Sequence, residues 1–151
     1  MAVFEEEFTV HAAADAVWDF LLDPTRLAAC IPGCETLQVE DATTYRVRLT
    51  VKVGFLSTTQ DLRLTITEAN RPRRLVAVGR GEDRKLASHV EVRNTLDLAP
   101  APAGATLVRY RSEVRVLGRL GSVGDAVMQV KAKQLAGDFA ARVRAALEAR
   151  A

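Results

Sequence analysis

Apolar and polar residues alternate with a period of two through most of the chain between residues 34 and 117. The clearest run is Tyr45–Val53, where tyrosine, valine and leucine alternate with arginine, threonine and lysine. The same period predicts a first strand at residues 3–10 and later strands at residues 57–68, 74–81, 88–99 and 105–117. No helical pattern separates the later strands, so they predict an antiparallel meander.

Two short helices are predicted between the first strand and the meander. Residues 13–22 place apolar side chains at helical spacing, and Pro24 ends this helix because the residue before a proline avoids the α region. Asp23 can then cap a second short helix that has Pro24 at its first position. Pro32 and Gly33 end that second helix.

A long helix is predicted over about residues 122–150, with Ser122 as its cap. Its continuous apolar face consists of Met128, Ala132, Leu135, Ala136, Phe139, Val143 and Leu147. A second stripe lies nearly opposite and comprises Val123, Val127 and Val130. Two explanations of this stripe stay open: burial beneath the chain's own short helices, or contact with a second copy in a homodimer.

Together these elements predict one α+β domain over residues 1–151, in which a curved antiparallel sheet of about seven strands surrounds the long C-terminal helix. A curved sheet cannot touch a straight helix along its whole length. We therefore expect a cavity between the two, with an apolar wall drawn from the inward-facing positions of the strands.

A few polar residues interrupt this apolar wall. A buried amide or hydroxyl without a partner costs about 1–3 kcal/mol, so these groups are expected to bond a ligand, one another or ordered water. The predicted ligand-binding residues are Tyr45, Val47, Leu49, Gln60, Leu62, Asn94, Tyr110, Ser112, Val127, Met128 and Leu135. The predicted cavity entrance is formed by Leu27, Ile31, Pro32, Phe55, Leu56 and Val123.

Charge and composition exclude several classes of function. The formal charge of +2 comes from nearly balanced acidic and basic residues, which gives no signature of nucleic-acid binding. No apolar run reaches transmembrane length, so a cytoplasmic protein is expected.

The possible metal ligands are too few and too scattered for a zinc site, and we predict no metal and no cofactor. They are Cys30, Cys34, His11 and His89. Both thiols are interpreted as reduced, small apolar groups.

Catalytic patterns are weak, and binding without catalysis is the favoured interpretation. No carboxylate falls clearly on an inward-facing position, and Ser112 has no base near it in the pattern. The alternative is an enzyme with an acid–base residue inside the cavity, for which the candidates are Tyr45, Tyr110 and Glu82.

The segment Asp23-Pro-Thr-Arg-Leu-Ala-Ala-Cys-Ile-Pro-Gly-Cys34, with Phe8-Thr-Val10, Val17-Trp18 and Lys133-Gln-Leu-Ala-Gly-Asp-Phe139, resembles the G-subunit family of carbon monoxide dehydrogenase. That family belongs to the helix-grip, START-like (SRPBCC) superfamily, which also includes polyketide cyclases. The resemblance therefore implies that the enzymatic alternative would be of the polyketide cyclase or dehydratase kind. The resemblance implies a non-catalytic accessory protein of a molybdenum hydroxylase complex, linked to membrane recruitment or quinone use. The expected partners are therefore a hydrophobic small molecule such as a quinone or lipid, the molybdenum hydroxylase, and transiently the inner membrane face.

Overall fold

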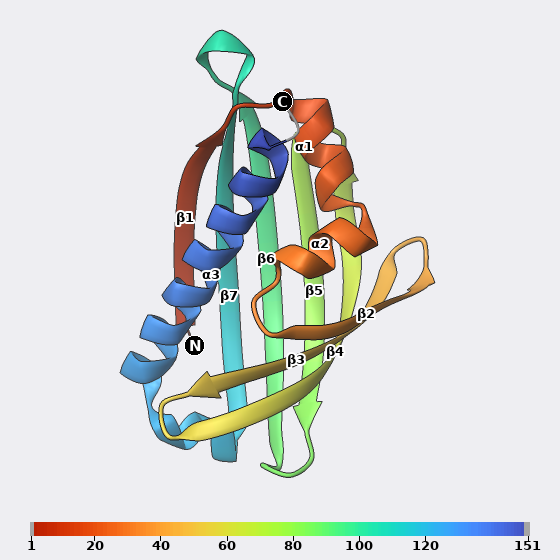
Figure 1. Ribbon diagram of the computed structural model, residues 1–151. Helices are drawn as coiled ribbons and strands as arrows, with labels where there is room; N and C mark the ends of the chain where they lie inside the picture. Colours follow the sequence, from red (N-terminus) through yellow and green to blue (C-terminus); the bar gives the residue numbers. More distant parts are fainter. Residues whose placement is uncertain (1, 150–151) are drawn as a thin grey trace.

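The computed structural model describes residues 2–149, so Arg150, the predicted last residue of the long helix, lies outside the described residues. Figure 1 shows one curved sheet with the α-helices on its concave side. The strands are β1 (Ala2–Val10), β2 (Cys34–Asp41), β3 (Thr44–Val53), β4 (Leu56–Asn70), β5 (Arg74–Asp83), β6 (Ser88–Pro100) and β7 (Thr106–Gly118). The α-helices are α1 (Ala14–Leu21), α2 (Pro24–Cys30) and α3 (Asp125–Glu148).

The seven strands form one antiparallel sheet in the order β1-β7-β6-β5-β4-β3-β2. β2 to β7 are sequential neighbours, and β1 joins the far edge by pairing with β7 from Ala2 opposite Val114 to Val10 opposite Thr106. The predicted meander and the α+β helix-grip architecture are confirmed. In Figure 1, β3 and β4 bend forward so that their hairpin lies beneath the start of α3.

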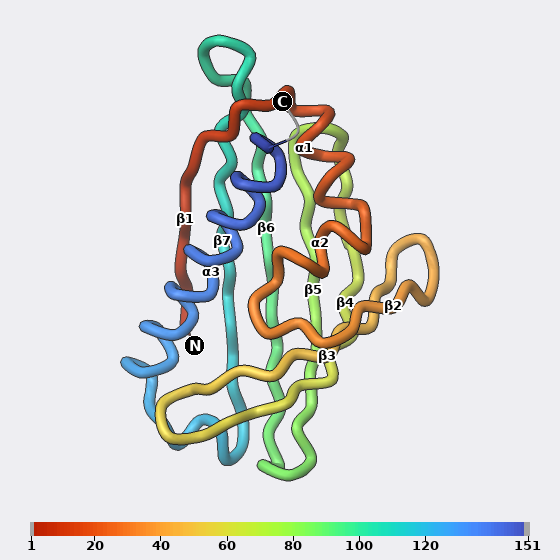
Figure 2. Tube along the Cα trace, viewed as in Figure 1, coloured from red at the N-terminus to blue at the C-terminus, as the bar shows by residue number. Residues whose placement is uncertain are grey.

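The helices occupy different parts of the concave face. α3 runs diagonally across the sheet beside β1, while α1 and α2 lie next to the C-terminal end of α3 (Figure 2). α2 forms as predicted: Asp23 Oδ1 accepts hydrogen bonds from the backbone N–H of Thr25 at 3.1 Å and Arg26 at 3.3 Å, and Pro24 occupies the first helical position.

The predicted start of the long helix is wrong by three residues. A short 3₁₀ helix spans Arg119–Val123, and α3 begins at Asp125 without a side-chain cap. Gly124 stands between them at φ 93°, a conformation that glycine adopts without steric cost. The chain uses this glycine to turn sharply from the sheet into α3, which leaves Ser122 outside the helix.

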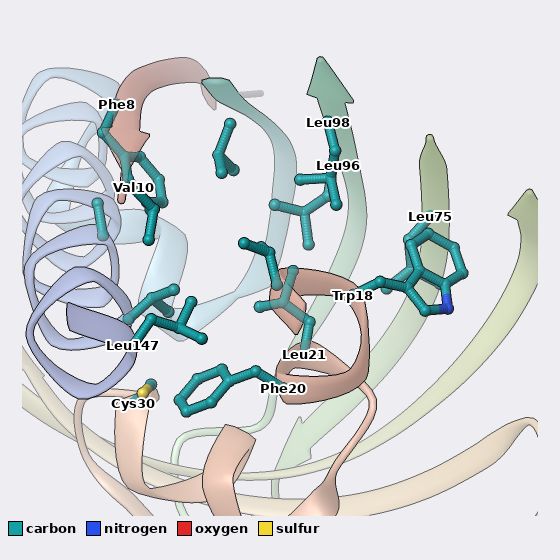
Figure 3. Packing of buried hydrophobic residues seen from close by; sticks show 14 residues of the cluster. Phe8, Val10, Trp18, Phe20, Leu21, Cys30, Leu75, Leu96, Leu98 and Leu147 are labelled. Carbon is teal, nitrogen blue, oxygen red and sulfur yellow. The ribbon is translucent and has the colours of Figure 1, made fainter. Parts of the chain in front are cut away.

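One end of the space between α3 and the sheet is filled by a compact core. α1 contributes Val17, Trp18, Phe20 and Leu21, all 3% exposed or less. Figure 3 shows Phe20 beside Leu147 of α3 and the buried Cys30 of α2. Amphipathic helix α1 therefore closes this end of the concave face.

Candidate functional site: a cavity between the sheet and α3

A cavity of about 290 Å³ lies between the concave face of the sheet and the N-terminal half of α3. Inward-facing side chains of β3 to β7 form its wall, and α3 covers it with Met128, Lys131 and Leu135. The C-terminal end of α2 completes the lining. The volume is at the lower end of the range that small-molecule sites occupy in proteins.

The structure brings most of the predicted ligand-binding residues to this cavity. Strand alternation placed these side chains on one face, and the curvature of the sheet turns that face toward α3. The lining includes Tyr45, Val47, Leu49, Gln60, Leu62, Asn94, Tyr110, Ser112, Met128 and Leu135, together with Leu27, Ile31 and Pro32 from the predicted entrance.

Four predicted residues do not reach the cavity wall. Val127 points instead at the β3–β4 hairpin, where its Cγ1 lies 3.3 Å from the position that a Cβ on Gly54 would take. Val123 and Leu56 pack in a cluster with Val53, while Phe55 is 77% exposed at the hairpin tip. The prediction of ligand contact at Val127 is thus corrected, because the hairpin reaches this face of α3 first.

The second stripe of α3 is not buried beneath the short helices. Val130 is 71% exposed and Val127 is 38% exposed, so the first of the two explanations is wrong for both residues. Val123 packs in the cluster formed with Leu120, and Val127 contacts the β3–β4 hairpin along one side. The stripe therefore leaves an apolar surface beside the hairpin tip.

A hydrogen-bonded cluster on β6 and β7 forms one polar position in the wall. Asn94 Oδ1 accepts from the Tyr110 hydroxyl at 3.1 Å and from the Ser112 hydroxyl at 2.7 Å. Burial raises the pKa of Tyr110 to about 12, so its phenol is neutral and donates at physiological pH. With Oδ1 occupied, Asn94 Nδ2 makes no hydrogen bond to any residue between 2 and 149 and is a donor that faces the cavity.

A second polar position lies on β4. Gln60 is 4% exposed and donates from Nε2 to Thr58 Oγ1 at 2.9 Å, and Thr58 Oγ1 donates to Asp83 Oδ2 at 2.7 Å. Burial raises the pKa of Asp83, but hydrogen bonds from Thr58 and from the backbone N–H groups of residues 59, 85 and 86 outweigh burial and lower it overall. Asp83 is therefore an ionised carboxylate that can only accept.

Sequence reasoning missed the small residues of β5 that make room for the cavity. Ala77 lines it, and a Cβ placed on Gly81 would lie 2.5 Å from Leu62 Cδ2 and 2.9 Å from Gln60 Oε1. Gly81 occupies an inward-facing position of a continuous strand. Period-two alternation from Leu75 would have placed both residues on the wall.

The acid–base candidates of the enzymatic alternative are divided between the two faces. Tyr45 and Tyr110 line the cavity, and burial raises the pKa of Tyr45 as well. Glu82 instead lies on the convex face, 3.7 Å from His89 Nδ1 through its Oε1. Among residues 2–149, no carboxylate side chain lines the cavity, and Lys131 is its one charged lining residue.

Both cysteines are free thiols in the structure. Burial raises the pKa of Cys30 and of Cys34, so both groups are protonated at neutral pH. Residues 2–149 contain no cluster of three or more histidine, cysteine, aspartate or glutamate side chains suited to a metal ion. In the same part of the chain, no helix combines the length and apolarity required to cross a membrane.

Solved structures define the class to which this fold belongs. A START superfamily protein from Mycobacterium smegmatis superposes with a TM-score of 0.79 at 11% identity, covering 100% of both chains. An aromatase/cyclase from a Streptomyces species gives 0.68 at 20% identity, covering 98% of this chain and 94% of its own. A conserved protein from Geobacillus kaustophilus gives 0.87 at 22% identity, covering 97% and 95%. The fold is START-like.

Within this class the family is defined by sequence. The family model for the carbon monoxide dehydrogenase G subunit (CoxG) matches residues 7–148, and the chain belongs to that family. The predicted family resemblance is confirmed. Comparison with curated protein sequences gives no significant match.

Proposed function

We propose that this protein is a non-catalytic carrier that binds a hydrophobic small molecule, a quinone or lipid-like ligand, in the cavity between the sheet and α3. The observation that carries the proposal is the wall itself: apolar side chains surround a cavity of about 290 Å³, and it is also lined by Asn94, whose Nδ2 makes no hydrogen bond to residues 2–149. Small-molecule sites obtain orientation from such sparse polar groups on an apolar wall.

The hydrogen bonds around Asn94 favour a ligand that carries a carbonyl oxygen. Tyr110 and Ser112 both donate to Asn94 Oδ1, which holds the amide with its nitrogen free. A buried carbonyl that met this nitrogen would gain a net hydrogen-bond energy of about 0.5–1.5 kcal/mol. A quinone meets this requirement, since it joins carbonyl groups to an otherwise apolar molecule.

Membership of the CoxG family supports an accessory role beside a carbon monoxide dehydrogenase of the molybdenum hydroxylase type. The apolar surface formed by Phe55, Val127 and Val130 is the proposed contact with that enzyme, because Val53 and Met128, their close chain neighbours, line the cavity. We place the protein in the cytoplasm.

A second copy of the chain and the inner membrane face are the competing partners for this apolar surface. Sedimentation of wild type and Val130→Lys, with and without vesicles, distinguishes the two.

Mass spectrometry after organic extraction tests the carrier function. Purified protein is expected to release a quinone or lipid, or to take one up when a long-chain quinone is added and excess is removed by gel filtration. Protein that is folded but neither releases nor takes up any such molecule would overturn the proposal.

A matched pair of variants on α2 locates the binding site. Ile31 follows α2 and lines the cavity, whereas Ala29 is exposed on the same helix and does not line it. Ile31→Asp is expected to abolish uptake because it places a charge in an apolar wall. Ala29→Asp is expected to bind like wild type, and equal loss in both would show that uptake does not depend on this cavity.

A further inference from the structure

The Gln60 side chain has one oxygen that no group of the protein satisfies. Gln60 lines the cavity, and its Oε1 is buried without a hydrogen-bond partner among residues 2–149. This is the one such side-chain atom in that part of the chain. A buried acceptor left unpaired costs about 1–3 kcal/mol, so a polar group without a partner is a feature that a ligand can use.

The neighbours of Gln60 fix which end of its amide is left free. Asp83 is ionised and can only accept, so the single proton of the Thr58 hydroxyl is donated to Asp83 Oδ2 at 2.7 Å. Thr58 Oγ1 can then only accept a hydrogen bond from Gln60, so Gln60 donates from the N–H of Nε2 at 2.9 Å. Turning the amide over would place two acceptors against each other. Oε1 is therefore held as the free acceptor.

We infer that Gln60 Oε1 is a specificity determinant that selects ligands carrying an O–H or N–H donor over ligands of the same shape without one. This inference rests on the proposed carrier function and names the chemistry that the same cavity recognises. Thr58 acts as a positioning residue because its Oγ1 accepts from Gln60 Nε2, and Asp83 acts on Gln60 through Thr58.

The two polar positions of the wall thus have opposite hydrogen-bonding character. Asn94 Nδ2 donates, while Gln60 Oε1 accepts. Gln60 Oε1 lies beside Gly81, which pairs with Val90, and Val90 is four residues from Asn94 along β6. At about 3.3 Å per residue, the two positions are separated by about 13 Å along the strand direction. For a quinone-type ligand, the Gln60 position favours the reduced quinol, whose hydroxyl donates, over the quinone, whose carbonyl only accepts.

Two isomeric probes test this inference. Para-heptylphenol and para-hexylanisole have the same molecular formula and differ in whether the oxygen carries a proton. Titration calorimetry gives the ratio of their affinities for wild type, Gln60→Met, Thr58→Val and, as a control, Leu64→Met, a cavity-lining change that alters no polar atom. Comparing ratios between proteins cancels the different costs of removing the two probes from water.

The phenol-to-anisole affinity ratio is expected to fall about tenfold in Gln60→Met, which corresponds to about 1.4 kcal/mol. Thr58→Val should reduce the ratio less, because it frees the amide to turn without removing it, and Leu64→Met should leave it unchanged. An unchanged ratio in Gln60→Met, with both probes still bound, would overturn this inference and leave the carrier function standing. Failure of folded wild type to bind either probe or any long-chain quinone would overturn both.

Discussion

The two halves of α3 meet the same sheet in different ways. The C-terminal half buries Val143 and Leu147, at 1% and 5% exposure, against side chains of α1 and the sheet. The N-terminal half presents Met128 and Leu135, which are only partly buried and face a cavity. Both halves carry the same helical period of apolar residues, so the period of the helix does not decide which half is filled.

The two halves of α3 differ in the side chains that face them from α1 and the sheet. At the filled end, α1 inserts Trp18, Phe20 and Leu21 into the space that the curvature of the sheet leaves. The cavity lining includes neither Trp18 nor Phe20, and there β5 contributes Ala77, Gly79 and Gly81 at inward-facing positions. The cavity remains because large side chains fill the space at one end only. The site therefore depends on small residues at inward-facing positions of β5.

The largest expected effect comes from comparing a residue of the filled end with a residue that lines the cavity. Trp18→Ala removes a core side chain from the filled end and should lower the free energy of unfolding by about 3–5 kcal/mol. Leu135→Ala, which only enlarges an existing cavity, should cost about 1 kcal/mol or less. Urea unfolding of both variants measures the contrast. Equal losses would mean that the N-terminal half of α3 is packed as tightly as the C-terminal half.

Filling the cavity should separate ligand binding from stability. Ala77→Leu adds apolar volume where the wall has room, so ligand uptake should fall by more than about tenfold while the free energy of unfolding changes by less than about 1 kcal/mol. Ala69→Leu, at an exposed position of β4, is the matched control and should alter neither quantity. If side chains already filled the space, Ala77→Leu would instead destabilise the protein by about 1–3 kcal/mol.

The sequence predicted the wall of the cavity better than its rim. Alternation in strands such as Tyr45–Val53 decides which side chains face inward, and the sheet preserves that parity. Where a side chain lies along α3 relative to a loop depends on long-range packing, and Val127 lies outside the cavity lining because it packs against the hairpin at Gly54. Local pattern contains the first kind of information but not the second.

The polar residues of the site also divide into those that the local sequence pattern reveals and those that it does not. Gln60 and Asn94 were recognised because an amide on an apolar face is conspicuous in the pattern. Asp83 was missed, because its partners are a hydroxyl 25 residues away and backbone N–H groups of the next turn. The Thr58 hydroxyl comes within reach of Asp83 only when β4 and β5 are paired.

Asp83 supports the cavity from behind, and its loss should have an intermediate effect. Asp83→Asn replaces an acceptor of four hydrogen bonds and should cost about 1–3 kcal/mol in the free energy of unfolding. Since the pKa of Asp83 in the folded protein lies below its ordinary value, the carboxylate stabilises the protein above the unfolded pKa, and this stabilisation is lost as the pH falls through the folded pKa.

Urea unfolding at about pH 6 and about pH 3 tests this dependence. The difference in stability between wild type and Asp83→Asn should shrink at the lower pH, where the wild-type carboxylate gains protons. A difference that stays constant between the two pH values would contradict an ionised, hydrogen-bonded Asp83. Glu113→Gln, on the convex face, provides a carboxylate control that removes an ion pair with Arg111 instead.

The smallest effect is expected on the convex face, which belongs to neither half of the α3 contact. Arg109 Nε lies 2.8 Å from Glu7 Oε2 across β7 and β1, and both side chains are more than half exposed. Arg109→Gln should therefore change the free energy of unfolding by less than about 0.5 kcal/mol, and molar salt should remove even that difference. Ligand uptake should equal that of wild type. A measurable loss of uptake would show that the pairing of β1 with β7 controls the cavity on the opposite face of the sheet. The connection would be Tyr110, the chain neighbour of Arg109, whose hydroxyl donates to Asn94 Oδ1.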